Sequence, residues 1–69
     1  MEINLGQRLK ELREEKGLSQ KQLAEKTGLS SSSIARWELG QSEPTVSSVS
    51  VLCNFFEVSA DYLLGRTDY

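Results

Sequence analysis

The side chains that this sequence offers for chemistry are donors and acceptors of hydrogen bonds rather than nucleophiles or metal ligands. Its 69 residues include no histidine and one cysteine, Cys53. A disulfide and a Cys/His zinc site each need at least two such side chains, so we expect neither, and no other metal or cofactor. Four consecutive serines, Ser30–Ser33, are followed by Arg36, which shares a helical face with Ser32. A hydroxyl both donates and accepts and a guanidinium only donates, so this segment is suited to hydrogen bonding.

Catalysis is not expected of this chain. It lacks histidine, a cluster of metal ligands and a glycine-rich loop that could hold a phosphate. An enclosed pocket for a small-molecule ligand is also not expected in so small a domain. Cys53 lies within an apolar segment, where we expect it to fill space in the core rather than to react. The function must therefore rest on binding.

Charge is unevenly distributed along the chain. The formal net charge is −2 and the pI is about 5.0, which argues against indiscriminate binding to nucleic acid or to an anionic membrane. Residues 1–36 nevertheless hold seven Lys and Arg against five Glu, whereas residues 37–69 hold one Arg against five acidic residues. The basic residues therefore lie in the half of the chain that includes Arg36.

Length and composition indicate one soluble globular domain over residues 1–69. Hydrophobic residues make up 38% and charged residues 26% of the chain, unlike the composition of a disordered tail. No stretch approaches the ~20 apolar residues that span a bilayer, and the N-terminus lacks a basic region followed by an apolar run. We therefore expect a cytoplasmic protein without a membrane partner.

The spacing of apolar and capping residues predicts an all-α domain of five helices. Leu5, Leu9 and Leu12 recur on one helical face, and glycines end the first three helices. Serine or threonine precedes each later helix as an N-cap. A strand over 46–51 is the competing prediction for the fourth helix, but no second strand-like run could pair with it. The expected helices cover residues 5–16, 20–27, 31–39, 46–56 and 60–64.

Two of these helices form the informative unit. Helices 20–27 and 31–39 are separated by three residues that include Gly28, and such a joint sets two helices at about 90–120°. Ala24 is small where the helices touch, and Gly28 can adopt the positive φ that the turn requires. The apolar interior is supplied by Leu23, Leu29, Ile34 and Trp37. This arrangement is the helix-turn-helix unit, whose second helix can enter the major groove of DNA.

Five segments carry a resemblance to a known family. They are LREEKGLSQ (12–20), LAEKTG (23–28), SIARWELG (33–40), EPT (43–45) and VSADYLLG (58–65). Together they resemble the phage repressor and Cro-like helix-turn-helix domains, also called the XRE type. The resemblance implies a five-helix, lambda-repressor-like globule, usually dimeric on DNA, that regulates transcription by occupying an operator. We expect a repressor.

The resemblance assigns base-reading positions to the helix at 31–39. Ser31, Ser32 and Arg36 match positions that face base edges in the major groove. An arginine there can donate two hydrogen bonds to guanine O6 and N7, worth about 1–3 kcal/mol of discrimination between bases. A phosphate contact and a surface salt bridge are the alternatives for Arg36. A serine hydroxyl reaches only nearby base edges and has little preference among them. We therefore expect the serines to contribute little to direct readout of the sequence.

Contacts to the DNA backbone are also implied by the resemblance. Gln20, at the start of the second helix, matches a residue that hydrogen-bonds a phosphate, helped by the helix N-terminus. Gln41 and Ser42 match a loop whose backbone amides hold a phosphate. Ser33 is expected to face either a phosphate or solvent, and Ser30 is expected chiefly as an N-cap.

Two positions depart from the family pattern. Leu39 replaces a residue that is commonly polar or basic, and leucine cannot hold a phosphate. Glu57 stands where glycine often ends a helix, so we expect either a left-handed Glu57 or a different turn. Arg13 and Glu38, in contrast, match an ion pair that links the first helix to the end of the recognition helix. Two solvated charges are the alternative for that pair.

A dimer is expected on DNA, because a monomer with one base-reading arginine could hardly be selective. The half-sites of a palindromic operator would then lie about 34 Å apart, or a multiple of that distance. The candidates for the interface are Phe55, Val58, Tyr62 and Leu64, which otherwise complete the core. A protein-binding module, such as an antitoxin or antirepressor on the same scaffold, is the alternative function.

Overall fold

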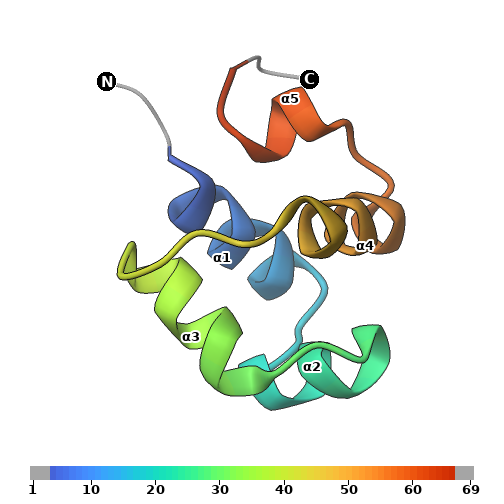
Figure 1. Cartoon of the computed structure of the whole chain (residues 1–69). Coiled ribbons are helices and arrows are strands. Elements are labelled where there is room, and N and C mark those ends of the chain that lie inside the picture. The colour runs from blue at the N-terminus through green and yellow to red at the C-terminus, as the bar shows by residue number, and fades with distance from the viewer. Residues whose placement is uncertain (1–3, 67–69) are drawn as a thin grey trace.

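Five helices and their connecting turns make up residues 4–66, the part of the chain that the computed structural model describes. They are α1 (Leu5–Glu15), α2 (Gln20–Thr27), α3 (Ser31–Leu39), α4 (Val46–Phe56) and α5 (Ala60–Leu63). No strand occurs in this part of the chain, so the expected all-α architecture is confirmed. Figure 1 shows α2 and α3 together at one end of the molecule, with α5 at the opposite end.

The helix bounds follow the local signals closely. α2, α3 and α4 have the expected ranges, whereas α1 and α5 each end one residue earlier than expected. Lys16 and Leu64 are the C-caps of these two helices, and each precedes a glycine with positive φ that closes the helix. α1 begins with a cap that the sequence analysis did not name, because the Asn4 carboxamide oxygen accepts the N–H of Gln7 at 2.9 Å.

Side-chain caps begin the other four helices, as expected. In each, the cap hydroxyl accepts the backbone N–H three residues later, and the caps are Ser19, Ser30, Thr45 and Ser59. At α2 the cap is reciprocal, since the Gln22 side chain also accepts the N–H of Ser19 at 2.8 Å. Each such cap contributes about 1 kcal/mol, which matters for helices of four to 11 residues.

Glu57 ends α4 in the left-handed conformation, with φ of 57°. It is the non-glycine residue with positive φ within residues 4–66. A side chain in this conformation costs roughly 1–2 kcal/mol relative to its preferred backbone. Of the two alternatives expected here, a left-handed Glu57 and a different turn, the first occurs.

Each of the five helices contributes one fully buried side chain to the core. These side chains are Leu9, Leu23, Ile34, Leu52 and Leu63, all without solvent exposure. Trp37 and Phe56 pack around them, and the half-buried Leu29 covers the cluster from the turn between α2 and α3. All five helices therefore share one apolar centre, and α3 is held through Ile34 and Trp37 on a single face.

α1 approaches the end of α3 very closely at Gly6. A Cβ atom at this position would lie 2.9 Å from the carbonyl oxygen of Glu38 and closer still to that of Trp37. Real side chains do not tolerate such contacts with backbone atoms. Gly6 therefore sets the distance between α1 and the C-terminal turn of α3, a role that its place within an ordinary helical pattern did not reveal.

Candidate nucleic-acid interface

The turn between α2 and α3 is built by local interactions. Gly28 adopts φ of 77°, and its N–H donates to the carbonyl of Ala24 at 2.8 Å. The Thr27 hydroxyl donates to the carbonyl of Leu23 at 2.7 Å, and it also accepts the N–H of Leu29 at 3.3 Å. Because the backbone N–H groups of Gly28 and Leu29 are both hydrogen-bonded to the end of α2, these bonds help to fix the orientation of α3 relative to α2.

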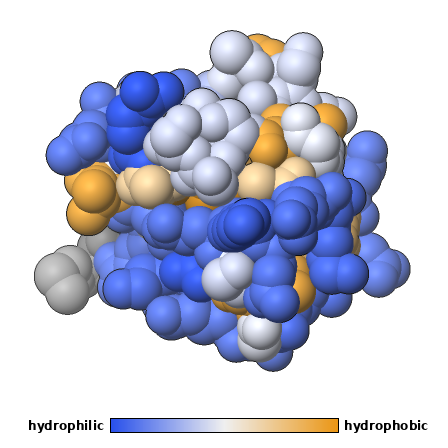
Figure 2. Space-filling view, turned by 90° about the horizontal axis from the view of Figure 1, so that it is seen from below, coloured by the Kyte–Doolittle hydropathy of each residue, from blue (hydrophilic) through white to orange (hydrophobic). Residues whose placement is uncertain are grey.

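α3 has a buried face and an exposed face. Ile34 and Trp37 point into the core, whereas Ser32, Arg36 and Leu39 are exposed. At about 100° per residue, these three lie within roughly 60° of one another and directly opposite the buried pair. We call Ser32, Arg36 and Leu39 the outer stripe of α3. Figure 2 views the molecule from the end formed by α2 and α3. Most residues on this face are hydrophilic, and a few are of intermediate hydropathy or hydrophobic.

Some of the serines at the start of α3 form hydrogen bonds with one another. The Ser30 hydroxyl accepts the N–H of Ser33 at 3.3 Å, which makes Ser30 an N-cap as expected. The hydroxyls of Ser30 and Ser32 lie 2.8 Å apart and share a hydrogen bond. Ser31 and Ser32 are exposed and Ser33 is half-buried. The cap therefore orients the hydroxyl of Ser32 on the exposed side of α3.

Arg13 and Glu38 join α1 to the end of α3 through a nearly buried ion pair. Arg13 Nε and Nη2 donate to the two carboxylate oxygens of Glu38 at 2.7 and 3.0 Å, and Arg13 Nη1 donates to the carbonyl of Leu18 at 2.7 Å. The hydrogen bond to Glu38 outweighs burial and raises the pKa of Arg13 above its ordinary value. The pair therefore holds the recognition helix in place while satisfying its own buried charges.

Gln20 extends this network to the start of α2. Its side-chain Nε2 donates to Glu38 Oε1 at 3.0 Å. A phosphate contact is expected of this amide, and one of its two N–H donors is already bonded to Glu38. The second donor remains, together with the first two backbone N–H groups of α2, because the Ser19 hydroxyl already accepts the third, that of Gln22.

The loop after α3 is less open to a phosphate than expected. The backbone N–H of Gln41 donates to the carbonyl of Arg36 at 2.9 Å, which closes the C-terminus of α3. That amide is therefore already used within the chain. The side chains of Gln41 and Ser42 remain exposed.

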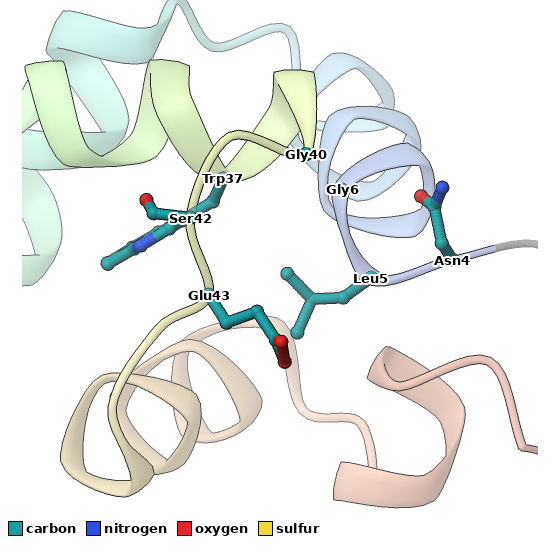
Figure 3. A pocket seen from close by; sticks show the side chains of 7 residues that line it. All are labelled: Asn4, Leu5, Gly6, Trp37, Gly40, Ser42 and Glu43. Carbon is teal, nitrogen blue, oxygen red and sulfur yellow. The ribbon is translucent and has the colours of Figure 1, made fainter.

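A hollow of about 260 Å³ lies between this loop and the start of α1. Its lining residues are Asn4, Leu5, Gly6, Trp37, Gly40, Ser42 and Glu43. Figure 3 shows the Glu43 side chain reaching toward Leu5. A carboxylate at this place repels an anion, so the hollow itself is a poor phosphate site.

Three of the four interface candidates pack within the single chain. Phe55 meets Phe56 edge to face at 5.1 Å, and the half-buried Val58 packs against the core. The Tyr62 ring lies 4.1 Å from the guanidinium of Arg8. Leu64 is 37% exposed and is the candidate that offers free apolar surface.

Arg8 was missed by the sequence analysis. It is only 8% exposed, and its Nε has no hydrogen-bond partner within residues 4–66. The available signal was its position between Leu5 and Leu12 at spacings of three and four, which places it on the buried face of α1. Its contact with Tyr62 joins α1 to α5.

Residues 4–66 contain no helix that is long and apolar enough to cross a membrane. No group of three His, Cys, Asp or Glu side chains is arranged to hold a metal ion in that range.

Comparison with known proteins identifies the class. A model of the helix-turn-helix family matches residues 9–63. The chain therefore belongs to the helix-turn-helix family, and the resemblance to phage repressor and Cro-like domains is confirmed. This family is one of transcriptional regulators rather than of enzymes.

Individual relatives extend this assignment. The chain is 36% identical over 66 residues to the HTH-type transcriptional regulator ImmR of Bacillus subtilis (strain 168), a match that covers 96% of this chain and 52% of ImmR. It is 41% identical over 65 residues to the HTH-type transcriptional activator BcrR of Enterococcus faecalis, covering 94% of this chain and 31% of BcrR. The chain thus spans about half or less of the length of these relatives.

A solved structure gives the same result for the fold. The P22 c2 repressor protein, determined in complex with a synthetic operator, superposes with a TM-score of 0.87 at 28% identity. The match covers 94% of this chain and 98% of the repressor chain.

Proposed function

We propose that this chain is the DNA-binding domain of a transcriptional regulator, and that it occupies a palindromic operator as a dimer with α3 in the major groove. The observation that carries the proposal is the outer stripe of α3. Ile34 and Trp37 anchor the opposite face of the helix, so the stripe is presented without participating in the core. The P22 c2 repressor, which has the same fold, was determined on a synthetic operator.

Arg36 is the principal base-reading residue in this proposal. Its side chain is exposed and forms no ion pair within residues 4–66, so the guanidinium is available to donate twice to a guanine. Ser31 and Ser32 reach the base edges nearest the start of α3. Their short side chains add little discrimination, which leaves Arg36 as the main source of selectivity in each half-site.

Phosphates are held chiefly at the start of α2. The donors for this phosphate are the free N–H of the Gln20 side chain and the first two backbone N–H groups of α2, where the helix dipole favours an anion. Glu38 orients Gln20 through the 3.0 Å hydrogen bond, and Arg13 offsets the negative charge of that carboxylate. The hydroxyl of Ser33 and the side chains of Gln41 and Ser42 supply secondary contacts.

Dimerisation follows from the small number of reading residues. Two copies double the base contacts and fix the half-site spacing at about 34 Å or a multiple. Leu64 is the exposed residue of the proposed interface, and the half-buried Phe55, Val58 and Tyr62 are its other members. A dimer of this kind on an operator acts as a repressor by blocking polymerase, and we place it in the cytoplasm with the DNA.

Selection of binding sites from random duplexes tests the proposal. We expect a palindrome, and we expect Arg36→Ala to lose selectivity at one base pair of each half-site. Arg66→Ala is a matched control, since Arg66 is an exposed arginine that follows α5, and α5 lies at the opposite end of the molecule from α2 and α3 (Figure 1). Recovery of no common sequence, or a strict monomer on the recovered site, contradicts the proposal. Binding to a protein partner that survives Arg36→Ala would favour the antitoxin-like alternative.

A further inference from the structure

We propose that Ser30 is a positioning residue for base recognition, because it leaves the Ser32 hydroxyl as a hydrogen-bond donor toward the major groove. The inference rests on the proposed function, since it needs the N-terminal turn of α3 to face base edges. Ser32 would then prefer bases that present an acceptor to it, which are guanine through O6 or N7, adenine through N7 and thymine through O4.

Three groups at the start of α3 form a chain of hydrogen bonds. The backbone N–H of Ser33 donates to the Ser30 hydroxyl at 3.3 Å, and the hydroxyl oxygens of Ser30 and Ser32 lie 2.8 Å apart. The second contact has the usual length of a bond between two hydroxyls. Ser30 and Ser32 are both exposed, so this chain of bonds ends at the surface, on the outer stripe.

The direction of the bond between Ser30 and Ser32 decides what Ser32 offers to a base. A serine hydroxyl has one proton to donate and two lone pairs with which to accept. If Ser30 donates, the proton of Ser32 remains for an outside acceptor. If Ser32 donates, its proton is used within the protein and only a lone pair is left for a base. The two directions therefore predict opposite base preferences.

Two effects favour donation from Ser30 to Ser32. Ser30 already accepts the N–H of Ser33, and a hydroxyl that accepts one hydrogen bond is polarised into a better donor. The start of a helix also carries partial positive charge, which favours hydroxyl protons that are directed away from it. The bonds therefore run from the Ser33 N–H through Ser30 to Ser32, whose own proton is left for the base.

The cap of α4 has the same order of bonds. The Thr45 hydroxyl accepts the N–H of Ser48 at 3.1 Å and donates to the Ser48 hydroxyl at 3.1 Å. A capping hydroxyl in this chain thus accepts from the backbone and donates to a serine of its own helix. Because α4 is not the proposed base-reading helix, Thr45 also provides a matched control for substitutions of Ser30.

Ser30→Asp is the variant that tests the direction. A carboxylate keeps the cap, since it accepts the N–H of Ser33, but it has no proton to donate and takes that of Ser32. Ser32 can then only accept. Its preferred base should change to one that presents a donor, which is cytosine through N4 or adenine through N6. Ser30→Thr keeps a hydroxyl and should keep the original preference.

Selection from random duplexes measures these preferences. The base pair that Ser32 reads is the one at which Ser32→Ala loses a preference of about fivefold, the effect of one neutral hydrogen bond. At this pair we expect Ser30→Asp to reverse the preference. Added negative charge weakens binding to all duplexes alike, so ratios between duplexes are compared. Thr45→Asp adds the same charge at the cap of α4 and should leave the ratios unchanged.

A double variant separates positioning from direct contact. In Ser30→Asp/Ser32→Ala the hydroxyl that reads the base is absent, so neither the original nor the reversed preference should remain at this base pair. A reversed preference that persists in the double variant assigns the contact to the new carboxylate and overturns the inference.

Three further outcomes also overturn the inference. The first is an unmodified chain that already prefers a donor at the base pair read by Ser32, and the second is a Ser30→Asp variant that keeps the acceptor preference. The third is a Ser32→Ala variant with unaltered preferences at every position, which removes the base contact itself. These results differ from failure of the proposed function, in which no selected duplex is bound at all.

Discussion

Arg13 and Glu38 lie 25 positions apart in the sequence and form a bidentate ion pair. Arg13 Nε lies 2.7 Å from one carboxylate oxygen of Glu38, and Arg13 Nη2 lies 3.0 Å from the other. Their side chains are 11% and 4% exposed, so each charge is stabilised mainly by the other rather than by water. The pair spans α1 and α3, and Gln20 joins it from α2. The carboxylate of Glu38 therefore connects α1 and α2 to α3, the helix that carries the proposed base-reading residues.

Removing one member of this pair should destabilise the domain strongly. We expect Arg13→Met to lower the free energy of unfolding by about 3 kcal/mol, because the Glu38 carboxylate is left buried without its partner. Urea denaturation measures the change. The double variant Arg13→Met/Glu38→Leu should recover much of the loss. Arg66→Ala breaks an exposed pair with Asp61 and should change stability by less than about 0.5 kcal/mol, so equal effects of the two arginine variants contradict this assignment.

Gly6→Ala should push α1 away from α3. The added Cβ meets the carbonyl oxygens of Trp37 and Glu38, so we expect a loss of about 2–3 kcal/mol in stability and weaker operator binding. Gly17→Ala is the comparison, because no atom lies within 4 Å of its added Cβ and only the positive φ of 69° is strained. Thermal unfolding should show a larger loss for Gly6→Ala. A smaller loss there would mean that α1 and α3 can separate at little cost.

Glu57→Gly should stabilise the domain. Glycine adopts the left-handed conformation at the end of α4 without the cost of a side chain, although it gives the unfolded chain more freedom. The net gain should be about 0.5–1 kcal/mol, seen as a rise in Tm of a few degrees. Glu57→Ala keeps the Cβ and should give no such gain. If both variants stabilise equally, the charge of Glu57 rather than its backbone is responsible.

Alkaline pH should weaken folding through Cys53. Burial raises the pKa of its thiol, so the unfolded chain loses this proton at a lower pH than the folded chain does. Stability is unaffected below the ordinary thiol pKa of about 8.5 and falls as pH rises above it. Urea titrations between pH 8 and 10 should show this decline, and Cys53→Ala should reduce it. Iodoacetamide should also modify the folded chain more slowly than the unfolded one.

Operator binding should depend on salt less steeply than the binding of a highly basic repressor does. α2 and α3 carry three cations, Lys21, Lys26 and Arg36, so a dimer neutralises at most about six phosphates through them. The slope of log K against log salt should then be no steeper than about −5. Lys21→Ala should make it shallower, and Glu25→Ala should not. A slope near −10 would show that cations elsewhere in the chain also contact DNA.

Features set by residues close together in the sequence were predicted well, and contacts between residues far apart in the sequence were not. Caps and terminating glycines act within four residues, so Ser19, Ser30 and Gly28 set the helix bounds closely. Contacts between distant residues left no such local signal. The hydrogen bond from Gln20 to Glu38 and the close approach at Gly6 depend on how α1, α2 and α3 meet in space. The resemblance drew attention to Gln20 but could not show that its side chain donates to Glu38.

The separation of the two faces of α3 has an evolutionary consequence. Ile34 and Trp37 hold the helix, and the outer stripe takes no part in the apolar centre. Substitutions on the stripe can therefore accumulate without loss of folding, and under the proposed function each of them changes which DNA sequence is preferred. Descendants of such a domain can acquire new target genes while inheriting the same scaffold.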